Sequence, residues 1–119
     1  MASTYTDGLG LEKPATGDKT GTWGTMENTI ADIIDRATMG NLSITCGSTA
    51  YTLTTTDGVA SEGQYGVLTF TSAGDPGGNV TVTISPNDQK KCFFIRNTLT
   101  NARDLIITQG SGGNVTITN

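Results

Sequence analysis

The sequence lacks histidine altogether, and with it the side chain that most often performs catalysis near neutral pH. None of the 119 residues is His. Ser–His–Asp and Cys–His nucleophile systems, imidazole acid–base catalysis and histidine-containing zinc sites are therefore excluded. We expect a protein that is not an enzyme, with no catalytic residue, no cofactor and no metal.

Charge is also scarce, and the charged residues that are present do not suit nucleic acid. They make up 15% of the chain, and the formal net charge is −4. Nucleic-acid binding depends on clustered Lys and Arg that neutralise phosphates, whereas the one basic doublet here is Lys90–Lys91. The start of a solvated strand explains this doublet. We expect no nucleic-acid partner.

Long hydrophobic runs are missing as well. No segment approaches the roughly 20 apolar residues of a membrane-spanning helix. The first residues, MASTYTDG, have neither the basic start nor the apolar stretch of a secretory signal. We expect no membrane contact and a protein made in a cytoplasm.

The remaining chemical candidates are carboxylates and one glycine-rich loop, and each has a simpler structural explanation. Asp32 and Asp35 stand on the polar side of a predicted helix, where charge keeps the surface solvated. The run GDKTGT departs from a phosphate-binding loop because Asp18 stands where that motif has glycine. Acidic residues beside glycines elsewhere in the chain favour turns over calcium binding.

Only two cysteines are present, Cys46 and Cys92, and both fall in strand-like runs far apart in the sequence. This spacing differs from the close pairs of a zinc site. We expect two reduced thiols in the core. A bridge formed after release from the cell is the alternative.

What the chain does contain is threonine and glycine, with 23 of the first and 16 of the second. Threonine is β-branched and favours strands, while glycine favours the turns between them. Seven runs alternate apolar and polar residues or are continuously apolar: NLSITC, YTLTT, YGVLTFTS, GNVTVTIS, KKCFFIRN, RDLIITQ and GNVTITN. We expect an all-β fold, a small antiparallel β-sandwich or barrel of about seven strands.

Two of these runs carry additional information. GGNVTVTI at 77–84 recurs as GGNVTITN at 112–119, which indicates two equivalent hairpin strands; two copies are too few to indicate a solenoid. KKCFFIRN at 90–97 is apolar on both faces, so that strand is central or contacts a partner. We therefore place Phe93 or Phe94 at a subunit interface.

One segment has helical periodicity instead. The spacing predicts an amphipathic helix over 26–38, with Thr25 as N-cap and Gly40 ending it. Its isoleucines, which we expect to dock on the sheet, are Ile30, Ile33 and Ile34. The helix belongs to a β domain over 25–119.

The segment before the helix, residues 1–24, has no period of 2 or 3.6 and is expected to be an extended N-terminal arm. Its apolar side chains, Leu9, Leu11 and Trp23, lie among glycines and threonines that offer no local burial. Tryptophan carries roughly 150–250 Å² of surface that favours burial. Either the chain's own core or another subunit covers Trp23, and we take all three side chains as interface anchors.

The segment GLGLEKPATGDKTGTWGTMENTIADIIDRA, residues 8–37, resembles one common near the N-termini of virion structural proteins of tailed bacteriophages, especially those of marine and cyanobacterial hosts. That pattern is approximately G-L-x-x-P-x-x-G-D-x-x-G-T-W-G-x-x-x-N, followed by a helix with I-D-x-A. It is carried here by Gly10, Pro14, Gly17, Asp18, Gly21, Thr22, Trp23, Gly24, Asn28, Ile34, Asp35 and Ala37. The remainder is similar to the small β module that follows this segment in many tail-fibre proteins.

The resemblance implies a virion structural protein, assembled in the host cytoplasm and located in the virion. Such fibre proteins usually continue into further modules, whereas this sequence stops at Asn119. We therefore expect a capsid decoration (cement) protein. The resemblance implies a homotrimer as its form, with the major capsid protein or tail proteins as partners, and we expect its N-terminal arms to hold the shell.

Two other functions are kept open. A tail component, either a short tail fibre or an adaptor, is structural but sits elsewhere on the particle. A carbohydrate-binding module would instead recognise the host surface by stacking sugars on exposed aromatic rings. The candidates for that stacking are Tyr5, Tyr51, Tyr65 and Trp23.

Overall fold

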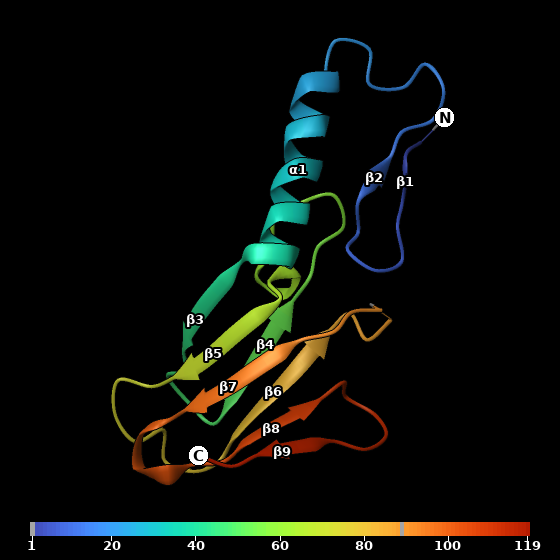
Figure 1. Cartoon of the computed structure of the whole chain (residues 1–119). Coiled ribbons are helices and arrows are strands. Elements are labelled where there is room, and N and C mark those ends of the chain that lie inside the picture. The colour runs from blue at the N-terminus through green and yellow to red at the C-terminus, as the bar shows by residue number, and fades with distance from the viewer. Residues whose placement is uncertain (1, 89) are drawn as a thin grey trace.

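A computed structural model describes residues 2–88 and 90–119 of the chain (Figure 1). Within these residues the protein is mostly β, with nine strands in three sheets and one α-helix. The strands are β1 (Thr4–Tyr5), β2 (Glu12–Lys13), β3 (Asn41–Thr45), β4 (Ala50–Thr54), β5 (Val67–Thr71), β6 (Val80–Ser85), β7 (Phe94–Thr98), β8 (Leu105–Thr108) and β9 (Val115–Ile117), and the helix is α1 (Trp23–Met39). The expectation of a mostly β chain with one helix is confirmed.

The chain alternates between two sheets as it proceeds from β3 to β8. One sheet has the order β3-β5-β7 and the other β4-β6-β8-β9, and all pairs from β3 to β8 are parallel. Each coil of chain thus gives one strand to each sheet, and register partners in the same sheet lie 25 to 31 residues apart in the sequence. The result is a short β-solenoid of three coils.

The core lies between the two sheets and consists of side chains stacked in register. Leu42, Leu68 and Ile95 are register partners on β3, β5 and β7. On the opposite sheet, Val80 and Leu105 pair in the same way and both are fully buried. Stacking brings like side chains from successive coils together, so each coil buries its apolar side chains against the next.

The predicted antiparallel sandwich or barrel is therefore wrong in its pairing. All seven predicted strands are present, but only β8 and β9 form an antiparallel hairpin among them. The alternation of apolar and polar residues identifies one buried face per strand and does not identify the neighbouring strand. The loops rich in turn residues join strands that lie in opposite sheets. Hairpin turns would instead have joined neighbouring strands of one sheet.

The two recurring GGNVT segments also have a different relation from the predicted one. They form β6 and β9, which flank β8 on its two sides, β6 parallel and β9 antiparallel. They are not equivalent hairpin strands. The fold is a solenoid after all, although its repeat lies in strand spacing and not in this short motif.

α1 extends beyond the ends of the strands and gives the molecule its elongated form, 54 × 27 × 20 Å (Figure 1). It begins three residues earlier than predicted, with Thr22 as the N-cap residue in place of Thr25. The predicted docking of three isoleucines on the sheet is wrong for Ile34, which is 42% exposed, whereas Ile33 is buried and Ile30 is half-buried. One row of the helix is covered while the neighbouring row faces outward.

A half-buried amide side chain closes the last coil. Asn97 occupies the register position that Ile44 and Phe70 hold in the earlier coils. Its Nδ2 donates to the carbonyls of Arg103 (2.8 Å) and Ile117 (2.9 Å), and its Oδ1 accepts from the backbone N–H of Leu99 (2.9 Å). These bonds link β7 to the chain on both sides of β8.

We expect Asn97→Ala to lower the free energy of unfolding by about 2–3 kcal/mol, because three backbone groups lose their partner. Asn114→Ala is the matched control, since Asn114 is exposed in the loop before β9, and it should change stability by less than about 0.5 kcal/mol. Denaturant unfolding of both variants measures the difference. Equal stabilities would contradict the role given to Asn97.

Candidate interaction surface

The five predicted anchors separate into two exposed and three partly covered side chains. Trp23 is the first residue of α1 and is 51% exposed, and Phe94 is the first residue of β7 and is 75% exposed. Phe93 is half-buried against the core. Leu9 and Leu11 are half-buried in the turn that joins β1 to β2. Trp23 and Phe94 are therefore the anchors available to a partner.

The N-terminal segment is not the extended arm that the sequence predicts. β1 and β2 pair as an antiparallel hairpin, and the hairpin is bonded to the rest of the chain. The carbonyl of Gly10 accepts from the N–H of Gly58 (2.7 Å), and that of Asp7 accepts from the N–H of Lys90 (3.3 Å). The glycine- and threonine-rich sequence of this segment does not predict the docking, because its hydrogen-bond partners Gly58 and Lys90 lie far along the chain. The boundary near residue 24 between attachment segment and β domain stays a prediction.

A buried glutamine, which the sequence analysis missed, holds this hairpin in place. Gln64 is fully buried, and its Nε2 donates to the carbonyls of Leu9 (3.3 Å) and Val59 (2.9 Å). Its Oε1 accepts from the N–H of Ser61 (2.8 Å), which completes a capping box over the 3-10 turn Glu62–Gln64. The signal was present as Ser-x-x-Gln at 61–64, the usual capping-box spacing.

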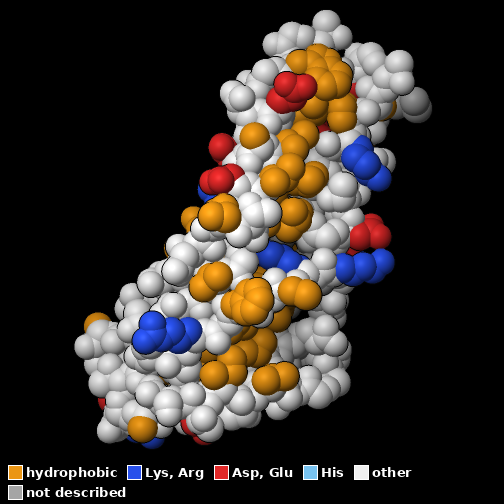
Figure 2. Space-filling view, viewed as in Figure 1, with side chains coloured by type: hydrophobic (Ala, Val, Ile, Leu, Met, Phe, Trp, Pro, Cys, Tyr) orange, Lys and Arg blue, Asp and Glu red, His pale blue; other side chains and the backbone are white. Residues whose placement is uncertain are grey.

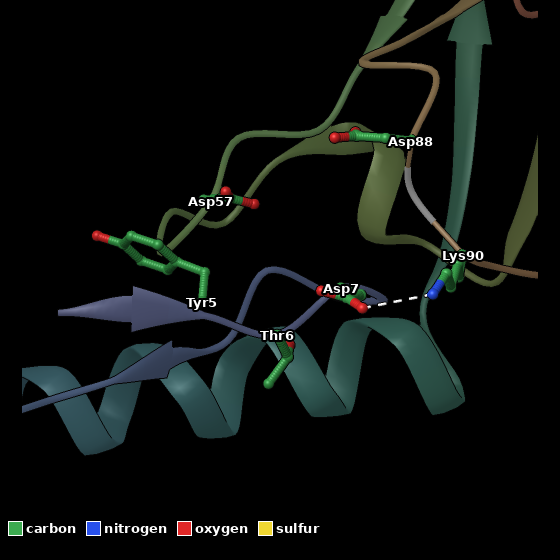
Figure 3. A pocket seen from close by; sticks show the side chains of 6 residues that line it. All are labelled: Tyr5, Thr6, Asp7, Asp57, Asp88 and Lys90. Atoms are coloured by element: carbon green, nitrogen blue, oxygen red, sulfur yellow. Dashed lines mark hydrogen bonds and ion pairs between the residues drawn. The ribbon is translucent and has the colours of Figure 1, made fainter.

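The hollow between hairpin and β domain is open and polar (Figure 3). Its volume is about 300 Å³ and its lining residues are Tyr5, Thr6, Asp7, Asp57, Asp88 and Lys90. Lys90 Nζ lies 3.4 Å from Asp7 Oδ2, and both side chains are solvent-exposed, so this ion pair is weak. Across the described ranges, no three Cys, Asp or Glu side chains come close enough together to hold a metal ion.

The tyrosines proposed as sugar platforms are mostly occupied by their own chain. Tyr51 donates its hydroxyl to Glu62 (2.6 Å), and burial together with this carboxylate raises the pKa of Tyr51 to about 12. The guanidinium of Arg36 lies 5.2 Å from the centre of the Tyr65 ring. Tyr5 and Trp23 stay accessible but lie in different elements.

A bidentate ion pair joins two loops. Arg103 donates to both carboxylate oxygens of Asp75 at 2.8 Å, and Asn101 adds a third bond to the same group. The Arg103 guanidinium holds the pKa of Asp75 well below its usual range. The three residues join the loop before β6 to the turn before β8.

Both cysteines are free in the structure, but only one is in the core. Cys46 is buried, and its burial raises the pKa of its thiol. Cys92 is exposed in the segment before β7, so the expectation of two core thiols is wrong for this residue. The run KKCFFIRN leads into an edge strand of its sheet and not a central one. Phe93 and Ile95 pack against the core, whereas Phe94 faces outward.

Exposed and half-buried apolar side chains lie along α1 and at the start of β5 and β7; we call this set the apolar stripe and define it as Trp23, Ile30, Ile34, Val67 and Phe94. Figure 2 shows apolar atoms running along α1 and onto the front sheet. The last turn of α1 meets the sheet closely, because a Cβ on Gly66 would lie 2.6 Å from the carbonyl oxygen of Ala37. Val67 and Phe94 are register partners on the outer face. Sequence reasoning found both ends of the stripe and missed its middle.

A half-buried lysine ties the segment before β7 to the 3-10 turn. Lys91 Nζ donates to the carbonyls of Gly63 (2.6 Å) and Tyr65 (2.9 Å) and lies 4.7 Å from the centre of the Phe93 ring. Burial lowers the pKa of Lys91 to about 8. The charged form is therefore held at a cost that its two carbonyl partners offset only in part.

We expect Lys91 to make the protein more stable as the pH rises from about 8 to 10. The unfolded chain, with the ordinary lysine pKa near 10.5, binds more protons than the folded chain in this range, so the free energy of unfolding increases. The measurement is the free energy of unfolding against pH for wild type and for Lys91→Met. The difference between the two curves removes the contribution of the other titrating groups. The exposed neighbour provides the control: Lys90→Met should keep the wild-type slope, and an identical slope in all three proteins would contradict the prediction.

We expect Gly58→Ala to release the hairpin. Gly58 has φ of +70°, and a Cβ there would lie 2.7 Å from Tyr5 Cε1, so the substitution displaces β1 in addition to straining the backbone. Gly112→Ala is matched in φ (+76°) but meets no atom within 4 Å, and it should cost only about 1–2 kcal/mol of backbone strain. Hydrogen exchange at the Thr6 and Gly10 amides should accelerate in Gly58→Ala alone. Unchanged protection there would show that the hairpin does not depend on this contact.

The surface is thus distinguished by the apolar stripe and by a docked hairpin. Within residues 2–88 and 90–119, no helix combines the length and the apolar character that a membrane crossing requires. Comparison with protein-family profiles, with curated proteins and with solved structures finds no match for this chain.

Proposed function

We propose that this chain is a structural protein of a tailed-bacteriophage virion, which acts by binding other virion subunits. The observation that carries the proposal is the exposure of two large apolar side chains, Trp23 at the start of α1 and Phe94 at the start of β7. Large exposed apolar patches mark interaction sites in soluble proteins. The resemblance of residues 8–37 to a segment of phage virion proteins supports the same function.

The placement we propose first is on the capsid, as a decoration protein. The β-solenoid would rest on the shell while the N-terminal region, ending in Trp23, contacts neighbouring subunits. Two contacts carried by one chain strengthen each other through their high effective concentration. The partners are the major capsid protein and other copies of this chain, in a trimer as the resemblance implies.

A tail component is the second candidate, and the shape of the molecule favours it. The long axis of 54 Å is twice the next dimension, and α1 and the solenoid follow one another along it (Figure 1). Such a form suits a rod-like part of a tail fibre or adaptor. This elongated form suits a protein seated on the capsid surface less well.

The number of copies per particle tests both placements. Quantitative mass spectrometry of purified virions, together with localisation of the density, should find many copies spread over the shell for a decoration protein. Few copies at one vertex would establish the tail component instead. Absence of the chain from the particle would refute the virion function.

We expect Trp23→Ala to weaken attachment to the virion by at least about tenfold, as for a central aromatic anchor. Because the side chain is half exposed, the melting temperature of the isolated protein should change little. Val115→Ala, on an exposed residue of β9, is the control and should leave attachment unchanged. Normal attachment with a large loss of stability would place Trp23 in the core of its own chain.

A further inference from the structure

The two sheets do not end at the same level. The sheet β4-β6-β8-β9 has one strand more than the sheet β3-β5-β7, because β9 adds a fourth strand beyond β8 (Figure 1). β7 is therefore the last strand of its own sheet among the residues that the structure describes. Since successive coils stack, a further strand beside β7 would lie opposite β9.

The backbone groups at the free edge of β7 belong to Ile95 and Asn97. The N–H of Phe94 donates to the carbonyl of Gly66 (2.9 Å), so the backbone of Phe94 faces β5. Backbone groups alternate between the two edges along a strand, so the N–H and C=O groups of Ile95 and Asn97 point away from β5. Across the described part of the chain, no second strand pairs with them.

This edge has little of the protection that natural sheets give their edges. Protected edge strands are very short, contain proline or a bulge, or carry inward-pointing charge. β7 has five residues without proline, and all five are in continuous register with β5. β9, which ends the other sheet, has only three residues. The edge of β7 is therefore the one at this end that can accept another strand.

The side chains beside the edge differ between its two faces. Toward the core, Ile95 and Ile117 are half-buried, whereas Leu68, the register partner of Ile95 in the preceding coil, is fully buried. On the outer face, Arg96 is exposed and its register partner Thr69 is uncharged. No residue that the structure describes forms an ion pair with Arg96. A segment that fits this edge presents apolar side chains to the core and a carboxylate beside Arg96.

We infer that an extended segment of another protein, with apolar and acidic residues in alternation, pairs with the free edge of β7 as an added strand. Backbone groups that face one edge of a strand recur about every 6.6 Å, and an extended peptide has the matching spacing. Strand addition uses these main-chain bonds for affinity and alternate side chains for specificity. The row of donors and acceptors thus selects a strand, which an apolar surface alone does not.

The inference deepens the proposed function by naming the kind of segment that a virion partner supplies. It rests on that function only for the source of the segment. Because β7 has five residues, the added strand is a small contact and should bind weakly by itself. In a particle it acts together with the other contacts of the same chain, which raises its effective concentration.

Peptide binding to the isolated full chain tests the edge. The probe is a blocked nine-residue peptide that alternates threonine with valine and carries glutamate in place of the central threonine. The amide signals of Ile95 and Asn97 should shift in NMR spectra with a dissociation constant of about 1 mM or lower. The same peptide with N-methylated backbone nitrogens lacks the donors and should not bind. Absence of shifts at about 1 mM peptide, or equal binding of the N-methylated peptide, would overturn the inference.

Charge reversal tests the predicted side-chain match. Arg96→Glu should raise the dissociation constant of the glutamate peptide about fivefold, because an attraction becomes a repulsion. Ser43→Glu is the control, since Ser43 holds the corresponding exposed register position on β3, and it should leave the constant unchanged. Circular dichroism checks that both variants are folded. Equal binding by Arg96→Glu and wild type would contradict an acidic partner.

Hydrogen exchange tests the same edge in the particle. In the isolated chain, the amides of Ile95 and Asn97 should exchange faster than those of Arg96 and Thr98, which face β5. In purified virions the first two amides should exchange at least tenfold more slowly. Unchanged exchange in a virion that contains the chain would overturn this inference alone. Absence of the chain from virions would refute the proposed function alone, because peptide binding then decides whether the edge accepts a strand.

Discussion

In-register stacking of apolar side chains between successive coils is the constraint on which the rest of this structure depends. A parallel strand pair cannot be joined by a short turn, so the chain must leave the sheet and return. Here it returns by way of the facing sheet, and the stacked rows of leucine, isoleucine and valine lie between the two sheets. Each coil is stabilised by its neighbours and not by its own local contacts.

The stack of coils ends at β7 in one sheet and at β9 in the other, and these ends determine which side chains are exposed there. β9 covers the last strand of one sheet, whereas β7 lies at the edge of the other. Asn97 satisfies the backbone at this end, but Phe94 beside it stays 75% exposed. An edge strand has hydrogen-bonding groups directed away from the sheet, which can pair with another chain unless the edge is blocked. The same end therefore supplies both a structural cap and part of the proposed interface.

One buried and one half-buried polar side chain connect the N-terminal hairpin to this scaffold. Gln64 binds the turn of the hairpin, and Lys91 binds the 3-10 turn that contains Gln64. A buried amide or ammonium group is costly unless its hydrogen bonds are made, so each fixes the backbone around it. The hairpin is held by directional bonds, while α1 above it presents a bare apolar row.

The sequence by itself determined the positions of the seven main strands, the helix, the absence of histidine chemistry and the two exposed anchors Trp23 and Phe94. These features follow from local periodicity and residue type, which act over a few neighbouring residues. Only the tertiary structure decided that the strands pair in parallel, that residues 4–13 fold back as a hairpin and that Ile34 and Val67 join the anchors in one stripe. These features depend on contacts between residues far apart in the chain: Leu9 meets Gln64, and Val67 meets Phe94. Alternation of apolar and polar residues along a strand specifies which side chains are buried. Which strand pairs with which depends on the packing of all three coils together.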